Sequence, residues 1–292
     1  MRNLAWILCI YVLACGSAFC ADYERPTAWQ GIKHIVVVIL ENTNFKDAKA
    51  QPFLGGLAKK GALLTDYKAI THPSQPNYIA MISGNTHGVL TDANANIDKL
   101  HLGDLLEYGN KTWKVYAEGY PGNGFLGSKS GKYVRKHVPF LSFKNVQSSP
   151  SRLANIIDLW EFFKDQKYNS LPHFALVIPD QDNNGHDTNA ARASYSMNTV
   201  LSSMINDPEI MKDTVLVLTF DEDDRTDGNR VYTVILGAGV KENVTSNKEY
   251  NHYSLLKTIQ EIYQIGNLGE NDRDAKLILD IWKAPPTTHR PK

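Results

Sequence analysis

The chain has 292 residues, of which 42% are hydrophobic and 21% are charged. This composition excludes an intrinsically disordered protein and allows one large α/β domain as readily as two smaller ones. The 31 basic and 31 acidic residues cancel, so the net charge gives no sign of a nucleic-acid partner or of a polybasic membrane anchor. Any partner must therefore be inferred from a site.

The first twenty residues have the order of a secretory signal peptide. Arg2 precedes an apolar run over residues 4–15, and small residues follow that run. The run is too short to span a bilayer comfortably, so we expect a secreted or periplasmic protein with no stable membrane insertion. Residues 12–15 also resemble a lipobox, and this leaves open a second route in which Cys15 becomes a lipidated first residue.

The chain contains three cysteines, and all of them lie in or beside this segment: Cys9, Cys15 and Cys20. The processed protein is therefore expected to lack disulfides, cysteine nucleophiles and cysteine-ligated zinc. We assign residues 1–20 to the signal peptide and residues 21–292 to the mature domain.

Strand and helix patterns alternate from residue 32 onward. Residues 32–40 include a continuous β-branched run, which is typical of a strand buried on both faces of a parallel sheet. Further strands are predicted at 62–70, 112–117, 174–178, 215–220 and 232–236, and helices at 52–60, 100–108, 152–164, 188–205 and 255–263. Because no repeat or linker interrupts this alternation, the pattern predicts a single doubly wound α/β domain with a mostly parallel central sheet.

Residues 119–150 do not fit the alternation. They are rich in Gly, Ser, Lys and aromatic residues, and we predict a long irregular excursion that acts as a lid or substrate loop. The helix predicted next, over residues 152–164, has apolar residues at helical spacing. They are expected to be core contacts: Leu153, Ile156, Ile157, Trp160 and Phe163.

A serine stands at the start of a further predicted helix, in the sequence Thr-His-Pro-Ser-Gln-Pro-Asn-Tyr of residues 71–78. Pro76 suits the first position of a helix and Gly84 can end it, which places Ser74 at the helix N-terminus. Free backbone N–H groups and the positive end of the helix dipole favour a phosphate or a developing alkoxide there. Ser74 is therefore a candidate nucleophile, and an ordinary N-cap serine is the alternative.

Three predicted strands end in polar clusters, which are Glu41-Asn42, residues 180–187 and Asp221-Glu222. Open α/β sheets bind ligands at the carboxyl ends of their strands, so we expect these clusters to converge. Carboxylates brought together repel each other unless a cation lies among them. Their oxygens are hard ligands, which predicts a divalent metal ion, with Ca²⁺, Mg²⁺ or Mn²⁺ favoured and zinc as an alternative.

Asp182, His186 and His252 are additional candidates. Asp182 and His186 lie four residues apart in a glycine-containing loop, and His252 opens a later helix. Together these side chains could form a second metal site, or bind the phosphoryl oxygens and the leaving group. For each of them alone, a satisfied surface residue is the alternative.

The ordered set of motifs resembles the phosphoesterase family of the alkaline phosphatase superfamily, which includes acid phosphatases and phosphatidylcholine-type phospholipases C. The matching stretches are Leu40-Glu41-Asn42, His72-Pro73-Ser74-Gln75-Pro76-Asn77, Pro179 to Asp187, and Phe220-Asp221-Glu222. The resemblance implies an alkaline-phosphatase-like fold, with Ser74 as nucleophile and His186 near the phosphate. It implies metal ligation by Glu41, Asn42, Ser74, Asp221 and Glu222, and we assign substrate binding to His72, Asn77, Asp182 and His252.

We therefore expect an exported, metal-dependent phosphomonoesterase of the acid phosphatase type that acts on a small phosphate ester through a serine nucleophile. A phospholipase C acting on phosphatidylcholine-like lipids is the nearest alternative, because it shares this chemistry. A non-catalytic periplasmic anion-binding protein is an alternative of another class, but it would need no carboxylate cluster. The sequence leaves the physiological substrate, the pH optimum, the number of metal ions and the oligomeric state open.

Overall fold

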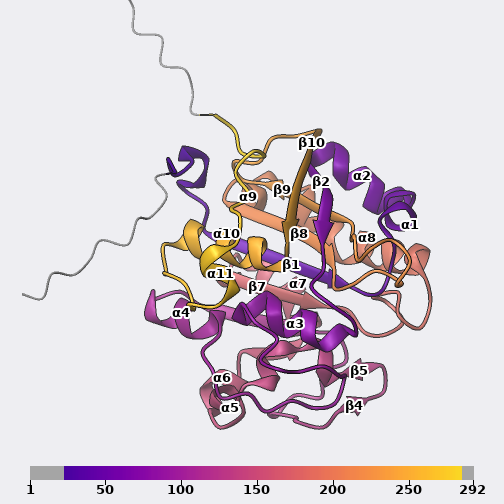
Figure 1. The fold of residues 1–292 in the computed structure, drawn as a ribbon, viewed down its shortest axis with the longest axis vertical. Coiled ribbons are helices and arrows are strands. Elements are labelled where there is room, and N and C mark those ends of the chain that lie inside the picture. Colours follow the sequence, from indigo (N-terminus) through magenta and orange to yellow (C-terminus); the bar gives the residue numbers. More distant parts are fainter. Residues whose placement is uncertain (1–22, 285–292) are drawn as a thin grey trace, which may run out of the picture.

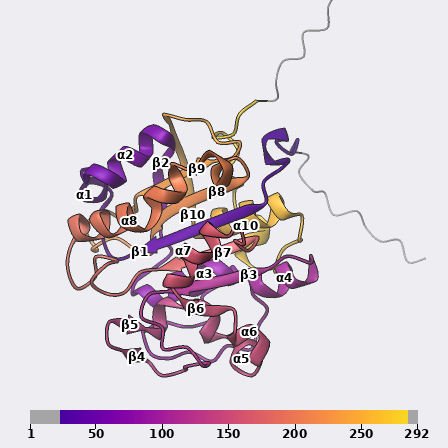
Figure 2. The same ribbon diagram turned by 180° about the vertical axis from the view of Figure 1, so that it is seen from behind.

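A computed structural model describes residues 23–284 of the chain (Figure 1). The predicted signal peptide and its three cysteines lie outside the described residues. The described part is built around one large sheet with helices on both faces (Figures 1 and 2). The α/β fold predicted from the sequence is confirmed.

The large sheet contains eight strands. They are β1 (His34–Leu40), β2 (Gly61–Lys68), β3 (Trp113–Ala117), β6 (Ile156–Asp158), β7 (Phe174–Ile178), β8 (Thr214–Phe220), β9 (Thr233–Gly237) and β10 (Val244–Asn251). Their order is β10-β2-β9-β8-β1-β7-β3-β6. Within this sheet β9 runs antiparallel to both neighbours, and the other pairs are parallel. The prediction of a mostly parallel sheet is therefore confirmed.

Strand β1 lies near the centre of the sheet, between β7 and β8. Six of its seven residues are buried, and all seven residues of β8 are buried. This explains why both strands have continuous apolar sequences, since a parallel strand covered by helices on both faces has no solvent side for polar residues. The carboxyl ends of β1 and β8 therefore lie side by side, and the chain leaves them at Glu41 and Asp221.

The helices form two layers. Their bounds are α1 (Phe45–Lys49), α2 (Pro52–Lys60), α3 (Ser74–Ser83), α4 (Leu102–Tyr108), α5 (Lys144–Gln147), α6 (Pro150–Leu153), α7 (Trp160–Lys167), α8 (Ala190–Ile205), α9 (Pro208–Met211), α10 (His252–Tyr263) and α11 (Asn271–Asp274). Helices α7 and α8 cover one face of the sheet, and α3 and α10 pack together on the other (Figures 1 and 2).

The single helix predicted over residues 152–164 is wrong. The chain there forms the end of α6, then strand β6, which pairs with β3, and then α7. The apolar spacing fits a helix, but pairing at the sheet edge overrides it, because a three-residue strand leaves little periodic signal. Trp160 was predicted to be a core residue, yet it is 74% exposed.

The segment 119–150 is more ordered than predicted. It contains the hairpin strands β4 (Lys129–Ser130) and β5 (Tyr133–Val134), the 3₁₀ helices η2 (Arg135–His137) and η3 (Pro139–Ser142), and α5. Several of its aromatic side chains are core residues, and the ring of Phe140 stacks on Trp113 with centroids 4.4 Å apart. The sequence did not reveal these elements because segments of two to four residues are too short to show a period.

The polar edge strand β10 has no counterpart among the predicted strands. Only Ser246 and Tyr250 of its eight residues are buried, so its sequence lacks the apolar alternation on which strand prediction depends. Across residues 23–284 there is no helix with the length and hydropathy needed to cross a bilayer.

Candidate active site

Helix α3 begins at Ser74 and ends at Gly84, which adopts the left-handed conformation with φ of +72°. The carbonyl oxygen of Gly84 accepts a hydrogen bond from the backbone N–H of Asn271, 3.0 Å away. Every residue of α3 is buried, and Ser74 is only 1% exposed. The sequence-based placement of Ser74 at a helix N-terminus is confirmed.

The backbone N–H groups at this helix start are less available than we expected. Pro76 has no N–H group, and the N–H of Gln75 donates to Asp92 Oδ1 at 3.1 Å. The first turn of α3 therefore lacks the set of free donors that makes other helix N-termini good anion sites. The helix dipole still favours negative charge at Ser74.

Three acceptor groups surround the Ser74 hydroxyl. Its Oγ atom lies 3.1 Å from Glu41 Oε2, 3.2 Å from Glu222 Oε1 and 3.5 Å from Asn42 Oδ1. A serine hydroxyl has one proton, so it can donate to only one of these oxygens at a time. The remaining contacts bring oxygens together without a proton between them, and they require a protonated carboxyl group or a cation nearby.

Two aromatic side chains lie against Glu41, and of these Tyr78 forms a hydrogen bond to it. The Tyr78 hydroxyl donates a hydrogen bond to Glu41 Oε1, and His137 Nε2 lies 3.2 Å from the same oxygen. The two rings stack with centroids 5.0 Å apart. This arrangement occupies Oε1 and leaves Oε2 directed at Ser74.

Sequence reasoning identified neither Tyr78 nor His137. Tyr78 follows Ser74 by four residues on α3, so the two side chains share a helix face, and that spacing was a usable signal. His137 comes from η2, within the segment predicted to be irregular, and no local pattern pointed to it.

Asp221 and Glu222 complete the cluster after β8. Asp221 Oδ1 accepts a hydrogen bond from the Asn42 N–H at 3.4 Å. Among the described residues, the fully buried Oδ2 atom of Asp221 has no hydrogen-bond partner. His72 contacts both Glu222 and Asp223, so it anchors the loop that carries Glu222.

Burial controls the acid–base properties of the cluster. It raises the pKa of Glu41 to about 8, against hydrogen bonds from Tyr78 and Ser74 that lower it. Burial also raises the pKa of Asp221 well above its ordinary value, and the nearby Glu41 adds to this shift. The pKa of Glu222 is raised for the same reason, although the contact with His72 opposes the shift. In each of these carboxyl groups, burial therefore favours the neutral form over the free carboxylate.

The donor chemistry of the cluster suits a divalent cation. No three His, Cys, Asp or Glu side chains of residues 23–284 are arranged as a group that could hold a metal ion by themselves. However, the unpaired oxygen of Asp221 is a buried acceptor without a donor, and carboxylate, amide and hydroxyl oxygens meet beside it. All of these are hard oxygen donors of the kind that Ca²⁺, Mg²⁺ and Mn²⁺ prefer.

The raised pKa values predict the pH dependence of stability in metal-free protein. A carboxyl group whose pKa is higher in the folded than in the unfolded state loses its stabilising effect as pH rises toward the folded value, about 8 for Glu41. Burial lowers the pKa of three histidines, His101, His137 and His252. These groups make the free energy of unfolding rise with pH below their ordinary pKa of about 6.5. We therefore expect the free energy of unfolding to fall between pH 6.5 and 8, by at most about 1.4 kcal/mol per pH unit for each carboxyl group.

Urea unfolding in chelator at several pH values measures this slope. The Glu41→Gln variant is the matched control, because its neutral amide cannot titrate and its slope should be smaller. A wild-type stability that rises from pH 6.5 to 8 would contradict the prediction.

Two of the predicted substrate-binding residues, Asn77 and His252, are hydrogen-bonded to other groups of the protein. Asn77 is fully buried, and its amide accepts from the N–H groups of Ile70 and Thr71 and donates to the carbonyls of Thr71 and Pro73. Its bonding groups are therefore occupied in shaping the loop before Ser74. His252 is likewise buried, with Nε2 2.8 Å from the carbonyl oxygen of Asp221 and Nδ1 3.2 Å from the Tyr67 hydroxyl.

Asp182 and His186 lie on the loop after β7. Asp182 pairs with Lys132 at 2.7 Å. His186 Nδ1 lies 2.9 Å from Asp187 Oδ1, and its ring centroid is 6.4 Å from that of His137. The His137 ring lies between His186 and Glu41. His186 is therefore at the border of the cluster and is not in contact with Ser74.

Comparisons with known proteins bear on this site. Residues 46–266 match the model of the Phosphoesterase family. The chain is 37% identical over 254 residues to a phosphatidylinositol-3-phosphatase from Mycobacterium tuberculosis, covering 85% of this chain and 82% of that protein. It is 33% identical over 283 residues to a probable acid phosphatase from Kluyveromyces lactis, covering 92% of this chain and 67% of that protein.

Solved structures give the same picture of the fold. A protein of the alkaline phosphatase superfamily from Vibrio parahaemolyticus superposes with a TM-score of 0.58 at 14% identity, covering 85% of this chain and 72% of that one. The chain spans between 57 and 67% of the length of the fungal acid phosphatases that it matches.

Proposed function

We propose a reaction for this site that starts from the family of the chain. The chain belongs to the Phosphoesterase family and is a phosphoric ester hydrolase. We infer that it is a phosphomonoesterase of the acid phosphatase type with Ser74 as its nucleophile. The observation that carries this proposal is the convergence of two buried carboxyl groups and one amide on the Ser74 hydroxyl, with the buried Asp221 in the same cluster.

In the proposed reaction Ser74 Oγ attacks the phosphorus of the ester. The bond from Oγ to phosphorus forms as the bond from phosphorus to the alcohol oxygen breaks, and water then hydrolyses the phosphoserine to regenerate the hydroxyl. The Ser74 proton has acceptors within 3.2 Å in Glu41 Oε2 and Glu222 Oε1. The hydrogen bond from the Tyr78 hydroxyl fixes the orientation of Glu41 during this step.

Members of the alkaline phosphatase superfamily generally depend on metal ions. We propose that Glu41, Asn42, Ser74, Asp221 and Glu222 hold a divalent cation, with Ca²⁺, Mg²⁺ or Mn²⁺ favoured. When bound, it would lower the pKa of the serine hydroxyl and offset the charge of the carboxylates and the phosphoryl group. A second ion near Asp182, His186 and His252 is not part of the proposal, because two of these side chains bond to other protein groups.

The alternatives from the sequence are less well supported. The relatives above are named phosphatases, which favours a monoester over the diester lipid of a phospholipase C. A non-catalytic anion-binding protein would gain nothing from carboxyl groups around its site, since they repel anions. Secretion or export to the periplasm remains part of the proposal, on the basis of the signal-like sequence of residues 1–20.

A side-by-side assay tests the proposed function. We expect release of phosphate from a small phosphomonoester such as p-nitrophenyl phosphate, and from phosphatidylinositol 3-phosphate in vesicles if lipid headgroups are accepted. Bis-p-nitrophenyl phosphate and phosphatidylcholine should react far more slowly. The Ser74→Ala protein, purified in parallel, measures contaminating phosphatase. Preferential cleavage of phosphatidylcholine would favour the phospholipase C alternative.

A further inference from the structure

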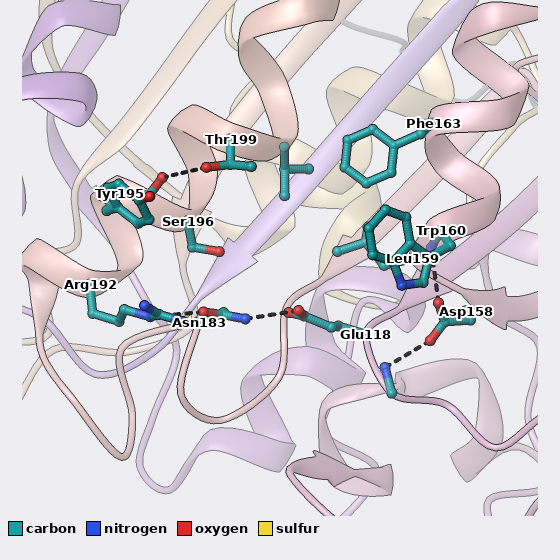
Figure 3. A pocket seen from close by; sticks show the side chains of 12 residues that line it. Glu118, Asp158, Leu159, Trp160, Phe163, Asn183, Arg192, Tyr195, Ser196 and Thr199 are labelled. Carbon is teal, nitrogen blue, oxygen red and sulfur yellow. Dashed lines mark hydrogen bonds between the residues drawn. The ribbon is translucent and has the colours of Figure 1, made fainter.

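A cavity of about 450 Å³ lies between α7 and α8, away from α3 (Figure 3). Its polar lining includes Glu118, which follows β3, Asp158 at the end of β6, and Asn183 in the loop after β7. The cavity is therefore at the carboxyl ends of three parallel strands, where open α/β sheets bind ligands. None of its lining residues belongs to the Ser74 cluster described above.

Two exposed aromatic rings line this cavity. Trp160, the first residue of α7, is 74% exposed, and Tyr195 of α8 is 66% exposed. The Trp160 ring lies beside that of Phe163, with centroids 5.6 Å apart. By contrast, the other three tryptophans of the described residues are at most 4% exposed. An indole left in solvent at a cavity mouth is typical of a binding surface.

A row of hydrogen-bonded polar side chains lies across the cavity from Trp160 and Phe163 (Figure 3). Arg192 Nε donates to Asn183 Oδ1 at 2.9 Å, and Asn183 Nδ2 donates to Glu118 Oε1 at 2.8 Å. Glu118 Oε2 accepts from the Asp180 N–H at 3.0 Å. This row is held in place from both ends, yet it keeps bonding capacity, since each carboxylate oxygen can accept a second hydrogen bond.

The charges of the lining argue against an anionic ligand. Two carboxyl groups, Glu118 and Asp158, face one guanidinium group, that of Arg192. An anion would therefore meet a net negative site. A neutral ligand with several hydroxyl groups can donate to the carboxylates and accept from Arg192 at the same time.

We propose that this cavity binds a neutral cyclic polyol, such as a sugar ring or an inositol ring. Such a ring has an apolar face of C–H groups, which stacks on Trp160 or Tyr195, and an edge of hydroxyl groups, which bonds to Glu118, Asn183 and Arg192. The volume is within the range of small-ligand sites. The cavity is separate from the Ser74 site, but Asn183 is adjacent to Asn184, whose carbonyl oxygen accepts the Glu41 N–H at 3.1 Å. The two sites therefore share the loop after β7.

Tryptophan fluorescence provides a test that does not depend on catalysis. Acrylamide quenches the fluorescence of exposed indoles. The part of the quenching that is lost in a Trp160→Phe variant is therefore due to Trp160 and reports on this cavity. We expect glucose or myo-inositol to protect Trp160 from acrylamide in a saturable manner. Cyclohexanol, a neutral ring with one hydroxyl group, and inorganic phosphate should give no protection. The glucose and inositol arms distinguish a sugar from an inositol ligand.

Matched variants locate the binding. Tyr195→Ala and Arg192→Ala should each weaken the protection at least tenfold. Tyr168→Ala should leave it unchanged, because Tyr168 is equally exposed at 68% but does not line the cavity. Circular dichroism of each variant verifies that it is folded.

Three results would overturn the proposal. Protection by cyclohexanol equal to that by the polyols would show an apolar site, and protection by phosphate would show an anion site. Absence of protection by glucose and myo-inositol at saturating solubility would show that neither ring binds. None of these results bears on the role of Ser74, which the phosphatase assay tests separately.

Discussion

Replacing Ser74 with alanine is expected to lower kcat by about 10³-fold or more, in line with the removal of nucleophiles from other enzymes. The substitution deletes the oxygen that would form the covalent bond to phosphorus, which lies between Glu41 Oε2 and Glu222 Oε1. The variant should fold normally, because the bonds of the Ser74 hydroxyl in the wild-type structure are to side chains and not to the backbone of the loop. Steady-state kinetics and urea unfolding measure the two effects.

Two further variants sharpen this result. Ser74→Thr keeps the hydroxyl and should keep part of the rate. Ser83→Ala is the matched control, since Ser83 is buried on the same helix but bonds to the carbonyls of Ile79 and Asn85. Rapid quenching with a labelled monoester should trap phosphate on the peptide that contains Ser74. A folded Ser74→Ala protein that retained the wild-type rate would show that water attacks phosphorus directly.

Stripping the protein of divalent cations is expected to abolish turnover and lower thermal stability, and adding Mg²⁺, Mn²⁺ or Ca²⁺ should restore both. The reason is that a cation offsets repulsion within the carboxyl cluster and satisfies the unpaired oxygen of Asp221. Calorimetric titration of each ion into metal-free protein measures binding without reference to activity. Full turnover in protein shown by elemental analysis to be metal-free would rule out this role.

The acidic run after β8 provides the matched variants for the metal experiment. Asp221→Asn should weaken ion binding, because it removes a buried carboxylate. Asp224→Asn should not, since Asp224 is exposed and its carboxylate bonds only to Thr226 in the described contacts. Asp223 is no control, although its place in an acidic loop predicts a solvated charge. It is buried, and its carboxylate accepts from the N–H groups of Arg225, Asp227 and Asn229.

The sequence predicted the structure best at positions where only one kind of residue fits the surroundings. The continuous apolar runs of β1 and β8 could be identified because both strands are buried on both faces. The clusters at Glu41 and Asp221 could be related to each other because parallel neighbours end at the same edge. The left-handed Gly84 was predictable as the end of α3, since few other residues adopt that conformation.

Tertiary contacts account for what the sequence did not reveal. His137 reaches Glu41 from a 3₁₀ turn, and nothing in its neighbourhood along the chain differs from an ordinary surface loop. The hydrogen bonds of Asn77 could not be predicted, because an amide side chain suits backbone and substrate equally well, and the four backbone groups that it contacts are brought together only by the folded loop. Trp160 fits a helical core pattern equally well, but β6 interrupts that helix and turns the indole outward.

The central position of β1 also determines how the chain must fold. Its two neighbours, β7 and β8, are formed by residues 174–178 and 214–220, so the middle of the sheet cannot assemble until most of the chain has been synthesised. Until then, the unpaired edges of a strand with six buried residues are exposed to other chains. Folding that waits for such distant pairings is slow compared with that of a helical bundle of similar length. We therefore expect the fraction of molecules that fold, rather than aggregate, to decrease as the protein concentration during refolding increases.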